Sequence, residues 1–265
     1  MTSWMVMLLK IICLVEDTPK DPLMGEHGLS LYIESDIRIL FDMGQSRLFA
    51  ENARRLGVDL RDVDVAVISH GHYDHGGGLR YFLEINDSAD VLLGEGAFTP
   101  RYAVNGGWRF IGLEEIHDDR IKFISKTESF PGFTVIRDFR DLFEKPAGNR
   151  ALFECLNGEP VPDSFSDELA IVIEDEGHLN LITGCSHNGI LNIVSKAYDI
   201  FHKPVDLLVG GFHLEGPSEG VASRLGEFVR GPVYTGHCTS EEARLSLAEG
   251  PVNVNPLQTG TEIIT

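Results

Sequence analysis

Four side chains that commonly bind metal ions lie within six consecutive positions. His70, His72, Asp74 and His75 directly follow the apolar run Val65–Ile68. Residues two apart in an extended segment point the same way, so His70 and His72 can reach one ion. Asp74 and His75 fall on the following turn and can face a second ion. Imidazole and carboxylate suit Zn²⁺, Fe or Mn better than Ca²⁺, so this segment predicts a metal site rather than a chance histidine-rich loop.

The elements around this segment predict an α/β fold. The short apolar run Val63–Ile68 is typical of a fully buried strand. Gly76-Gly77-Gly78 lets the backbone turn tightly before a helix begins at Leu79. Gly57 is expected to end the preceding helix. Strands are expected over residues 6–16, 29–34, 37–42 (as a hairpin with 29–34) and 91–94, and helices over 48–56 and 79–84.

The second half of the chain repeats a strand and helix rhythm that ends in histidines. His187, His213 and His237 each closely follow a glycine at the end of an expected strand. Ligand sites in α/β folds collect where strands end, so these three are expected to converge with the first cluster. Strands are expected over residues 169–174, 179–183, 205–209 and 233–235, the last as the final core strand, and helices over 190–200 and 221–229.

Residues 97–165 have a weaker pattern. Two apolar alternations predict strands over Ile121–Ile124 and Phe133–Ile136. The whole stretch, at about residues 97–165, is interpreted as an insertion that covers the active face within a single domain of residues 1–265, because loops in that position often select the substrate. Arg150, within this stretch, is a candidate for binding a substrate phosphate through its planar guanidinium.

Composition excludes several classes of protein. The net charge of −19 opposes binding to nucleic acid phosphates, and no cluster of lysine and arginine offsets it. The four cysteines form no paired C-x-x-C spacing, which favours a reducing cytoplasm over a disulfide framework. The apolar run Trp4–Val15 lacks a basic start and a cleavage site, and it is too short to span a bilayer. We therefore expect a buried first strand and no membrane partner.

The spacing H-x-H-x-D-H resembles the signature of the metallo-β-lactamase fold superfamily. Further segments resemble the branch described as 7,8-dihydropterin-6-methyl-4-(β-D-ribofuranosyl)aminobenzene 5′-phosphate synthase-like. This resemblance implies a four-layer αβ/βα sandwich, in which two mixed β-sheets are flanked by helices and the metal site lies at one edge. The segments that carry it are Glu26–Ser30, Phe41–Gln45, Ser69–His75, Gly184–Ile190, Gly210–Leu214 and Thr235–Thr239.

The resemblance also implies a ligand set. His70 and His72 would hold one metal, Asp74 and His75 the other, and His237 matches the last ligand histidine of the superfamily. Many members have a Thr-Gly-Asp triplet whose aspartate bridges both metals, whereas this chain has Thr183-Gly184-Cys185. Either Cys185 is a ligand, or His187 takes its place, or only one metal binds tightly. We favour His187, with Cys185 as a small buried neighbour.

The implied cofactor is one or two divalent ions, Zn²⁺ first, with Fe, Mn or Mg as alternatives. The implied reaction couples 7,8-dihydropterin pyrophosphate to 4-(β-D-ribofuranosyl)aminobenzene 5′-phosphate and releases pyrophosphate. The alternative enzyme is a metal-dependent hydrolase of a phosphorylated, ester or lactone compound that uses a metal-bound hydroxide. An electron-transfer di-iron protein and a metal-stabilised binding protein without turnover are the other classes. The expected partner is a phosphorylated small molecule. The sequence is compatible with either a monomer or a homo-oligomer.

Several residues have candidate roles in catalysis. Asp74 is a ligand or a base, but it cannot be both at once. His213 is a candidate general acid or substrate contact, because an unperturbed histidine titrates near neutral pH. His27 is a candidate substrate contact or a structural hydrogen-bonding residue.

Overall fold

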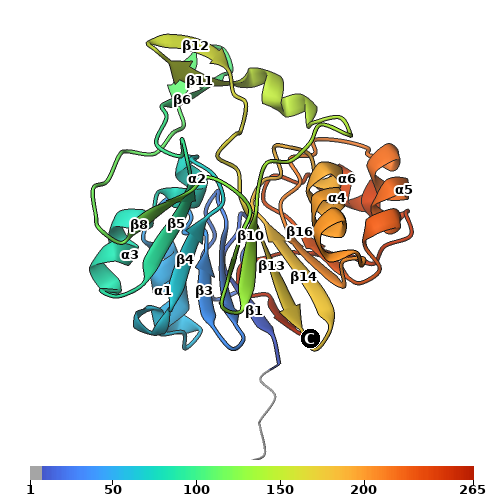
Figure 1. The fold of residues 1–265 in the computed structure, drawn as a ribbon, viewed down its shortest axis with the longest axis horizontal. Coiled ribbons are helices and arrows are strands. Elements are labelled where there is room, and N and C mark those ends of the chain that lie inside the picture. The colour runs from blue at the N-terminus through green and yellow to red at the C-terminus, as the bar shows by residue number, and fades with distance from the viewer. Residues whose placement is uncertain (1–7) are drawn as a thin grey trace, which may run out of the picture.

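Two seven-stranded β-sheets face each other, and helices cover the outer face of each (Figure 1). The structure is a computed structural model that describes residues 8–265. The four-layer αβ/βα sandwich implied by the resemblance is confirmed. Within residues 8–265, every helix falls short of the length and apolar character that a bilayer span requires.

The first sheet places the strand before the histidine cluster near its centre. The hairpin expected from the sequence is confirmed as the antiparallel pair β2 and β3, and β4 lies parallel to both β3 and β5. The expectation for residues 6–16 was too long, because β1 covers six residues and residues 6 and 7 lie outside the described part. In spatial order the strands are β18 (Glu262–Ile264), β1 (Lys10–Val15), β2 (Ser30–Glu34), β3 (Arg38–Phe41), β4 (Val65–Ile68), β5 (Asp90–Gly94) and β8 (Ile121–Ile124).

The second sheet brings the later histidines to the same end of the sandwich. Its strands β14, β15 and β16 run parallel, so the histidine-bearing segments leave the sheet at one edge. In spatial order the strands are β17 (Val254–Pro256), β16 (Val233–Thr235), β15 (Leu207–Gly210), β14 (His178–Thr183), β13 (Ala170–Asp175), β10 (Phe133–Ile136) and β9 (Glu128–Phe130).

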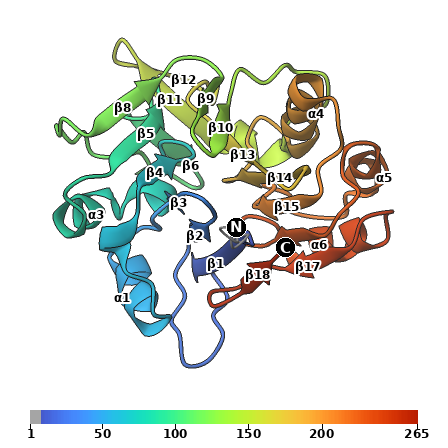
Figure 2. The same cartoon turned by 60° about the horizontal axis from the view of Figure 1, so that its bottom comes forward.

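Helices form the two outer layers, and Figure 2 shows them from below on opposite sides of the sheets. The helix α1 ends next to Gly57, whose positive φ of 76° is the left-handed conformation expected after a helix. On the first sheet lie α1 (Leu48–Arg55), the 3-10 turn η1 (Leu60–Asp62), the single-turn α2 (Tyr73–Gly76) and α3 (Leu79–Ile85). On the second lie α4 (Ile190–Phe201), α5 (Glu219–Phe228) and α6 (Glu241–Ala248).

Burial explains why β4 reads as a continuous apolar run. Val65 and Val67 join the core between the two sheets, whereas Ala66 and Ile68 join the core under α1 and α3. Both faces of the strand are therefore covered, and all four side chains are buried. This burial fixes the point at which the chain emerges and presents His70.

The C-terminal region departs from the expectation. Val233–Thr235 was expected to be the last core strand, but β17 follows it in the second sheet and β18 then returns to the first sheet beside β1. That expectation was wrong because each added strand has only three residues, too few for an alternating pattern to be recognised. The helix α6 was also not anticipated.

Residues 97–165 contribute strands both to the two main sheets and to a separate third sheet. The strands expected at Ile121–Ile124 and Phe133–Ile136 are confirmed, and as β8 and β10 they belong to the two main sheets. Other parts form a third sheet, which Figure 1 shows above the end of the sandwich where α2 lies. In spatial order its strands are β12 (Glu159–Pro162), β11 (Leu152–Leu156), β6 (Arg101–Val104) and β7 (Trp108–Phe110), and the 3-10 helix η2 (Ala147–Ala151) precedes β11.

The core between the sheets predicts a clear stability effect. Ile171 is completely buried there, whereas Ile264 on the edge strand β18 is 61% exposed. Ile171→Ala should lower the free energy of unfolding by about 2–5 kcal/mol, since it removes buried methyl groups and leaves a cavity. Ile264→Ala should change it by less than about 0.5 kcal/mol. Chemical denaturation of both variants measures this, and equal losses would contradict the packing described.

Candidate metal centre

Asp42 connects the chain segments around the end of β4, where the histidine cluster begins. It lies directly after β3, and its carboxylate accepts hydrogen bonds from the Ser69 amide at 2.7 Å and the Ser69 hydroxyl at 2.8 Å. The same carboxylate contacts His75 Nδ1 at 2.6 Å. Asp42 is completely buried, so this one side chain links the strand end to the following turn.

One group of donors comprises His70, His72 and His187. His70 Nε2 and His72 Nδ1 are 3.0 Å apart, and the ring of His187 lies 4.8 and 4.9 Å from the other two rings. His187 Nε2 is buried and has no hydrogen-bond partner among residues 8–265. Buried nitrogens normally find partners, so an unpaired atom beside two other imidazoles fits a cation site. We call these three residues the first donor set.

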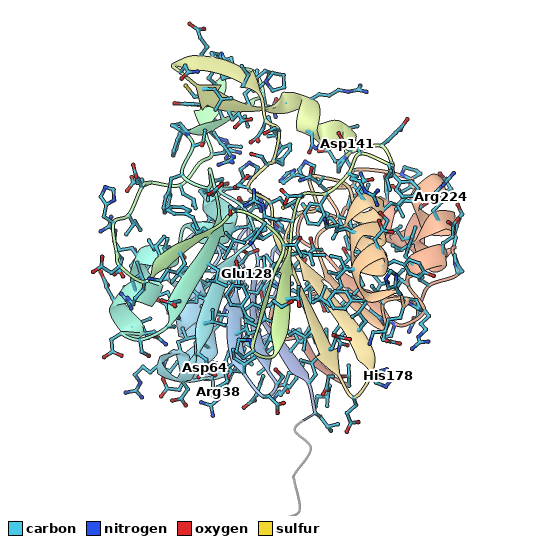
Figure 3. The ribbon with its side chains drawn as sticks, in the orientation of Figure 1. Arg38, Asp64, Glu128, Asp141, His178 and Arg224 are labelled. Atoms are coloured by element: carbon cyan, nitrogen blue, oxygen red, sulfur yellow. The ribbon has the colours of Figure 1, made fainter. Side chains whose placement is uncertain are left out.

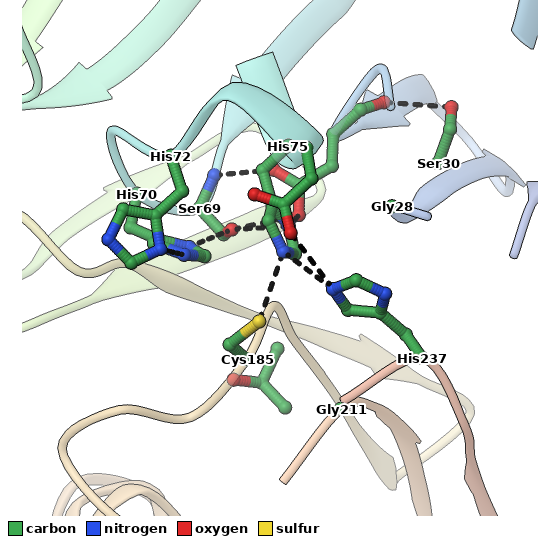
Figure 4. A network of polar contacts seen from close by, with 12 residues as sticks. Gly28, Ser30, Ser69, His70, His72, His75, Cys185, Gly211 and His237 are labelled. Atoms are coloured by element: carbon green, nitrogen blue, oxygen red, sulfur yellow. Dashed lines mark hydrogen bonds and ion pairs between the residues drawn. The ribbon is translucent and has the colours of Figure 1, made fainter. Parts of the chain in front are cut away.

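A second group comprises Asp74, His75 and His237. His237 Nε2 lies 3.3 Å from His75 Nε2 and 3.4 Å from Asp74 Oδ2. Figure 4 shows the side chains of His237 and His75 pointing toward each other from different parts of the chain. Two imidazole nitrogens and a carboxylate oxygen around one volume again match the ligands of a divalent ion. We call these residues the second donor set.

Cys185 lies between the two donor sets. Its Sγ is 3.1 Å from His75 Nε2, and it falls within 4.8 Å of donor atoms of both sets, including those of His70 and His187. Burial, followed by the neighbouring Cys238, raises the pKa of the Cys185 thiol well above its usual value. A thiol in this environment holds its proton until a cation replaces it. The geometry therefore brings both Cys185 and His187 to the centre, where the sequence posed them as alternatives.

The ring nitrogen that faces away from the centre is held in four of the five histidines. Such outer contacts fix the tautomer and orientation of metal-binding imidazoles, and they are typical of metal sites. The contacts join Nδ1 of His70 to Ser69 Oγ (2.9 Å), of His75 to Asp42 Oδ2 (2.6 Å), of His187 to Asn149 Oδ1 (3.0 Å) and of His237 to Asp17 Oδ1 (2.8 Å).

The electrostatics of the two sets differ. Burial lowers the pKa of His72 to about 3 and holds the pKa of His70 and His187 well below the usual value. These imidazoles are neutral and offer lone pairs. Burial also acts on His237, but hydrogen bonds to Asp17 and Asp74 outweigh it and raise the pKa of that imidazole. A cation at the second set would therefore displace a proton.

His27 and His213 lie at the rim of the centre. His27 is half exposed, and it contacts Asp17 through Nδ1 at 2.9 Å and Asp74 through Nε2 at 3.1 Å. The His213 ring lies 4.4 Å from the His187 ring, and its buried Nδ1 has no hydrogen-bond partner within residues 8–265. Both predicted residues thus reach the site without joining a donor set.

Arg150 is not brought to the donor atoms. It is exposed on η2 and makes no ion pair within the described part of the chain. Its neighbour Asn149 points to the centre instead, accepting from His187 Nδ1 and donating its Nδ2 to the His187 carbonyl at 2.7 Å. Sequence reasoning singled out Arg150 and missed Asn149, because no local pattern marks an asparagine that contacts a distant histidine.

Arg101 is a second residue that the sequence did not reveal. This buried guanidinium donates to Asp163 at 3.0 Å and to Asp167 at 2.7 Å. Asp167 in turn accepts from the Gly71 amide at 2.7 Å, between the first two histidines. A Cβ at Gly71 would meet the Ala97 carbonyl at 1.9 Å, so only glycine fits there. Arg101 therefore anchors the third sheet against the backbone of the first donor set.

Comparisons with known proteins agree with this geometry. Residues 25–188 match the metallo-β-lactamase superfamily, a span that includes the first donor set and Cys185. The chain belongs to this superfamily. An uncharacterized protein of Methanocaldococcus jannaschii is 32% identical over 255 residues, which cover 89% of this chain and 93% of that protein.

Three further proteins are similar to this chain. The 7,8-dihydropterin-6-methyl-4-(β-D-ribofuranosyl)-aminobenzene-5′-phosphate synthase of Methanocaldococcus jannaschii is 29% identical over 265 residues, 89% of each chain. A crystal structure described as a metal-dependent hydrolase of the β-lactamase superfamily has a TM-score of 0.82 and 31% identity over 96% of this chain and 98% of that one. A metallo-β-lactamase fold protein of Bacillus subtilis, with a TM-score of 0.58 and 16% identity over 97% and 99%, shares the fold alone.

The contact between Asp42 and His75 predicts an effect on metal affinity. Asp42→Asn should weaken the binding of Zn²⁺ about 10- to 100-fold, because the amide no longer provides a charged acceptor for the His75 Nδ1 proton. Asparagine tolerates the positive φ of 59° at this position, so the backbone is preserved. Competition with a chelator measures the affinity. Asp64→Asn, at the opposite end of the molecule (Figure 3), is the control and should retain full affinity.

The role of Arg101 predicts a selective effect on the first donor set. Arg101→Met should weaken Co²⁺ binding about tenfold or more and alter the visible spectrum of the bound ion, because Asp167 loses the partner that orients it. Arg137 is a matched control: it is also buried and donates to two carbonyl groups, those of Ile124 and Ser166. Arg137→Met should lower stability but leave the spectrum unchanged. The same spectral change in both variants would refute a specific role for Arg101.

Proposed function

We propose that this chain is a metal-dependent enzyme that couples 7,8-dihydropterin pyrophosphate to 4-(β-D-ribofuranosyl)aminobenzene 5′-phosphate and releases pyrophosphate. The observation that carries this proposal is the pair of adjacent donor sets that meet at Cys185. A relative named as the corresponding synthase matches 89% of the chain, which favours this reaction among those of the superfamily.

The donor atoms indicate which ions fit. His70, His72 and His187 would hold one divalent ion, and Asp74, His75 and His237 a second, with Cys185 next to both. Imidazole and thiolate favour Zn²⁺, with Fe or Mn as alternatives, whereas Mg²⁺ prefers oxygen ligands. When bound, such ions supply positive charge beside an anionic leaving group and lower the pKa of water. As a ligand, Asp74 is not free to serve as the base.

In the proposed reaction the amine nitrogen of the aminobenzene attacks the methylene carbon of the pterin. The C–N bond forms as the C–O bond to pyrophosphate breaks, and the nitrogen loses one proton. His213 is the proposed acceptor, because its buried Nδ1 has no other partner among residues 8–265 and it lies next to the first donor set. Proton transfer to a positioned imidazole typically contributes about 10²- to 10⁴-fold to a rate.

Two further residues are proposed to contact substrate. His27 has a carboxylate at each ring nitrogen, and its hydrogen bonds to Asp17 and Asp74 raise its pKa to about 9. It lies at the rim, where a pyrophosphate would approach, and it is proposed to contact that group after releasing one of these carboxylates. Arg150, exposed on η2, is proposed to contact the same group through its planar guanidinium.

A hydrolase is the second candidate. The relative whose crystal structure is described as a metal-dependent hydrolase covers 96% of this chain at 31% identity. Hydrolysis of a phosphorylated or ester compound would use the same donor sets, with water in place of the amine as the nucleophile. The two reactions differ only in what occupies the position beside the leaving group.

Incubation with both substrates tests the proposal. Metal-loaded protein should form the coupled product with one pyrophosphate per product, measured by mass spectrometry and a pyrophosphate assay. His72→Ala should lower the rate about 100-fold or more, since the metal supplies several kcal/mol to the transition state. His178→Ala, at the end of the molecule opposite the metal centre (Figure 3), is the control.

The outcomes separate the two candidates. Pyrophosphate release that does not require the aminobenzene compound would favour the hydrolase. A product that forms equally well after chelation of all metal would contradict both, because neither reaction would then depend on the donor sets.

A further inference from the structure

A cavity of about 610 Å³ is lined by residues that neighbour His187 and His213 in the sequence, and the mechanism above does not use it. Segments that flank the site residues form its walls. Gly189 and Ile190 follow His187, and Phe212 and Leu214 enclose His213 in the sequence. These walls therefore come within one or two residues of His187 and His213 along the chain. The volume of the cavity is within the range of small-molecule sites.

The cavity has a preformed wall. Residues 142–147 line one side, and the buried side chain of Asn192 fixes them to α4. Asn192 Oδ1 accepts from the Leu142 and Phe143 amides at 2.9 and 2.8 Å, and Asn192 Nδ2 donates to the Phe143 carbonyl at 2.9 Å. Three hydrogen bonds from one buried amide hold this wall in place, so a ligand would not have to order it.

The next residues of this wall extend to the metal centre. A Cβ at Gly148 would lie 2.9 Å from His213 Nε2, so the chain passes directly over that ring. Asn149 then bonds to His187. The cavity wall and the contacts of the first donor set thus belong to one continuous segment.

Arg224 gives the cavity its charge preference. Its guanidinium lies over the Phe143 ring, 5.4 Å from the ring centroid, and has no ion-pair partner among residues 8–265. Lys145, the other cation of the lining, is already paired with Asp141 at 3.1 Å. Figure 3 shows Arg224 at the right flank of the molecule, with Asp141 above it and to its left. An unpaired guanidinium on an aromatic ring is suited to a phosphate.

The rest of the lining limits what can bind. It combines apolar and polar surface, with the apolar part somewhat larger, so it can accept an aromatic body that carries polar groups. It also contains Glu144 and Glu219, so the cavity is not uniformly basic and an anion must approach on the Arg224 side. The ligand expected from this combination is an aromatic compound with a phosphate at the end remote from the reacting atom.

We infer that this cavity binds the sugar phosphate end of an aromatic amine phosphate, with the phosphate on Arg224 and the amine beside His213. This inference rests on the proposed function, whose two substrates differ in the required respect. The ribofuranosyl aminobenzene phosphate has its phosphate remote from its amine. The pterin pyrophosphate has its anionic group at the reacting carbon, so it cannot reach Arg224 and the metal centre in the same way.

Comparing the affinities of two ligands for two protein variants tests the inference without requiring the enzyme to react. Calorimetry on metal-free protein compares 4-(β-D-ribofuranosyl)aminobenzene 5′-phosphate with the same compound lacking phosphate, so neither ligand can bind through a metal. The phosphate should improve the affinity of the unaltered protein about tenfold, as expected for a charge-assisted hydrogen bond. In Arg224→Met the two ligands should bind within about threefold of each other.

Two further variants control for trivial effects. Arg230→Met removes an equal charge from an arginine that is already paired with Asp206, and it should keep the tenfold preference. Val221→Trp fills the cavity and should weaken both ligands. A full phosphate preference in Arg224→Met, or unaltered protein that binds neither ligand, would overturn the inference.

The coupling reaction then distinguishes the two proposals. If Arg224→Met does not change the rate of product formation at limiting aminobenzene phosphate, the proposed role of the cavity is refuted and the proposed reaction is retained. If binding depends on Arg224 but the protein forms no coupled product, the proposed role of the cavity is retained and the proposed reaction is refuted.

Discussion

The structure depends on the convergence of buried imidazole, carboxylate and thiol groups, among which Nε2 of His72 and Nε2 of His187 have no hydrogen-bond partner within residues 8–265. Ring nitrogens of His70 and His72 face each other at 3.0 Å, and His187 contributes a buried nitrogen with no partner among residues 8–265. Desolvated polar groups are costly to leave unpaired, so such an arrangement persists only when something compensates for it. A divalent cation can supply this compensation, because neutral imidazoles, a carboxylate and a thiol are suitable ligands for it.

The surrounding fold holds these atoms in place through contacts outside the donor sets. Asp42 links the ends of β3 and β4 to His75, and Arg101 ties the third sheet to the backbone between His70 and His72 through Asp167. The two seven-stranded sheets supply the rigid platform, because β4 is buried on both faces. The sheets therefore set the position of the centre, and buried polar contacts set the orientation of each ligand.

The sequence predicted the parts of this account that depend on local pattern. The run before His70 identified β4, and glycine-flanked histidines marked the strand ends of the second sheet. Cys185 could be located but not assigned, since a single position after a strand does not show which donor set it faces. The structure places it between both sets.

Other features lay beyond sequence reasoning for physical reasons. Arg101 is separated from Asp163 and Asp167 by about sixty residues, and nothing in their local sequence indicates the pairing. Strands β17 and β18 are too short to show alternation. The helix α6 did carry a signal, because Ser240 caps it by accepting from the Ala243 amide at 3.1 Å and two acidic residues follow.

Anomalous diffraction from crystals of the zinc-loaded protein would locate the bound ions directly. We expect two peaks at the zinc edge, one bounded by His70, His72 and His187 and one by Asp74, His75 and His237, with Cys185 Sγ adjacent to both. Zinc bound elsewhere, with these imidazoles bonded only to protein or water, would contradict this expectation.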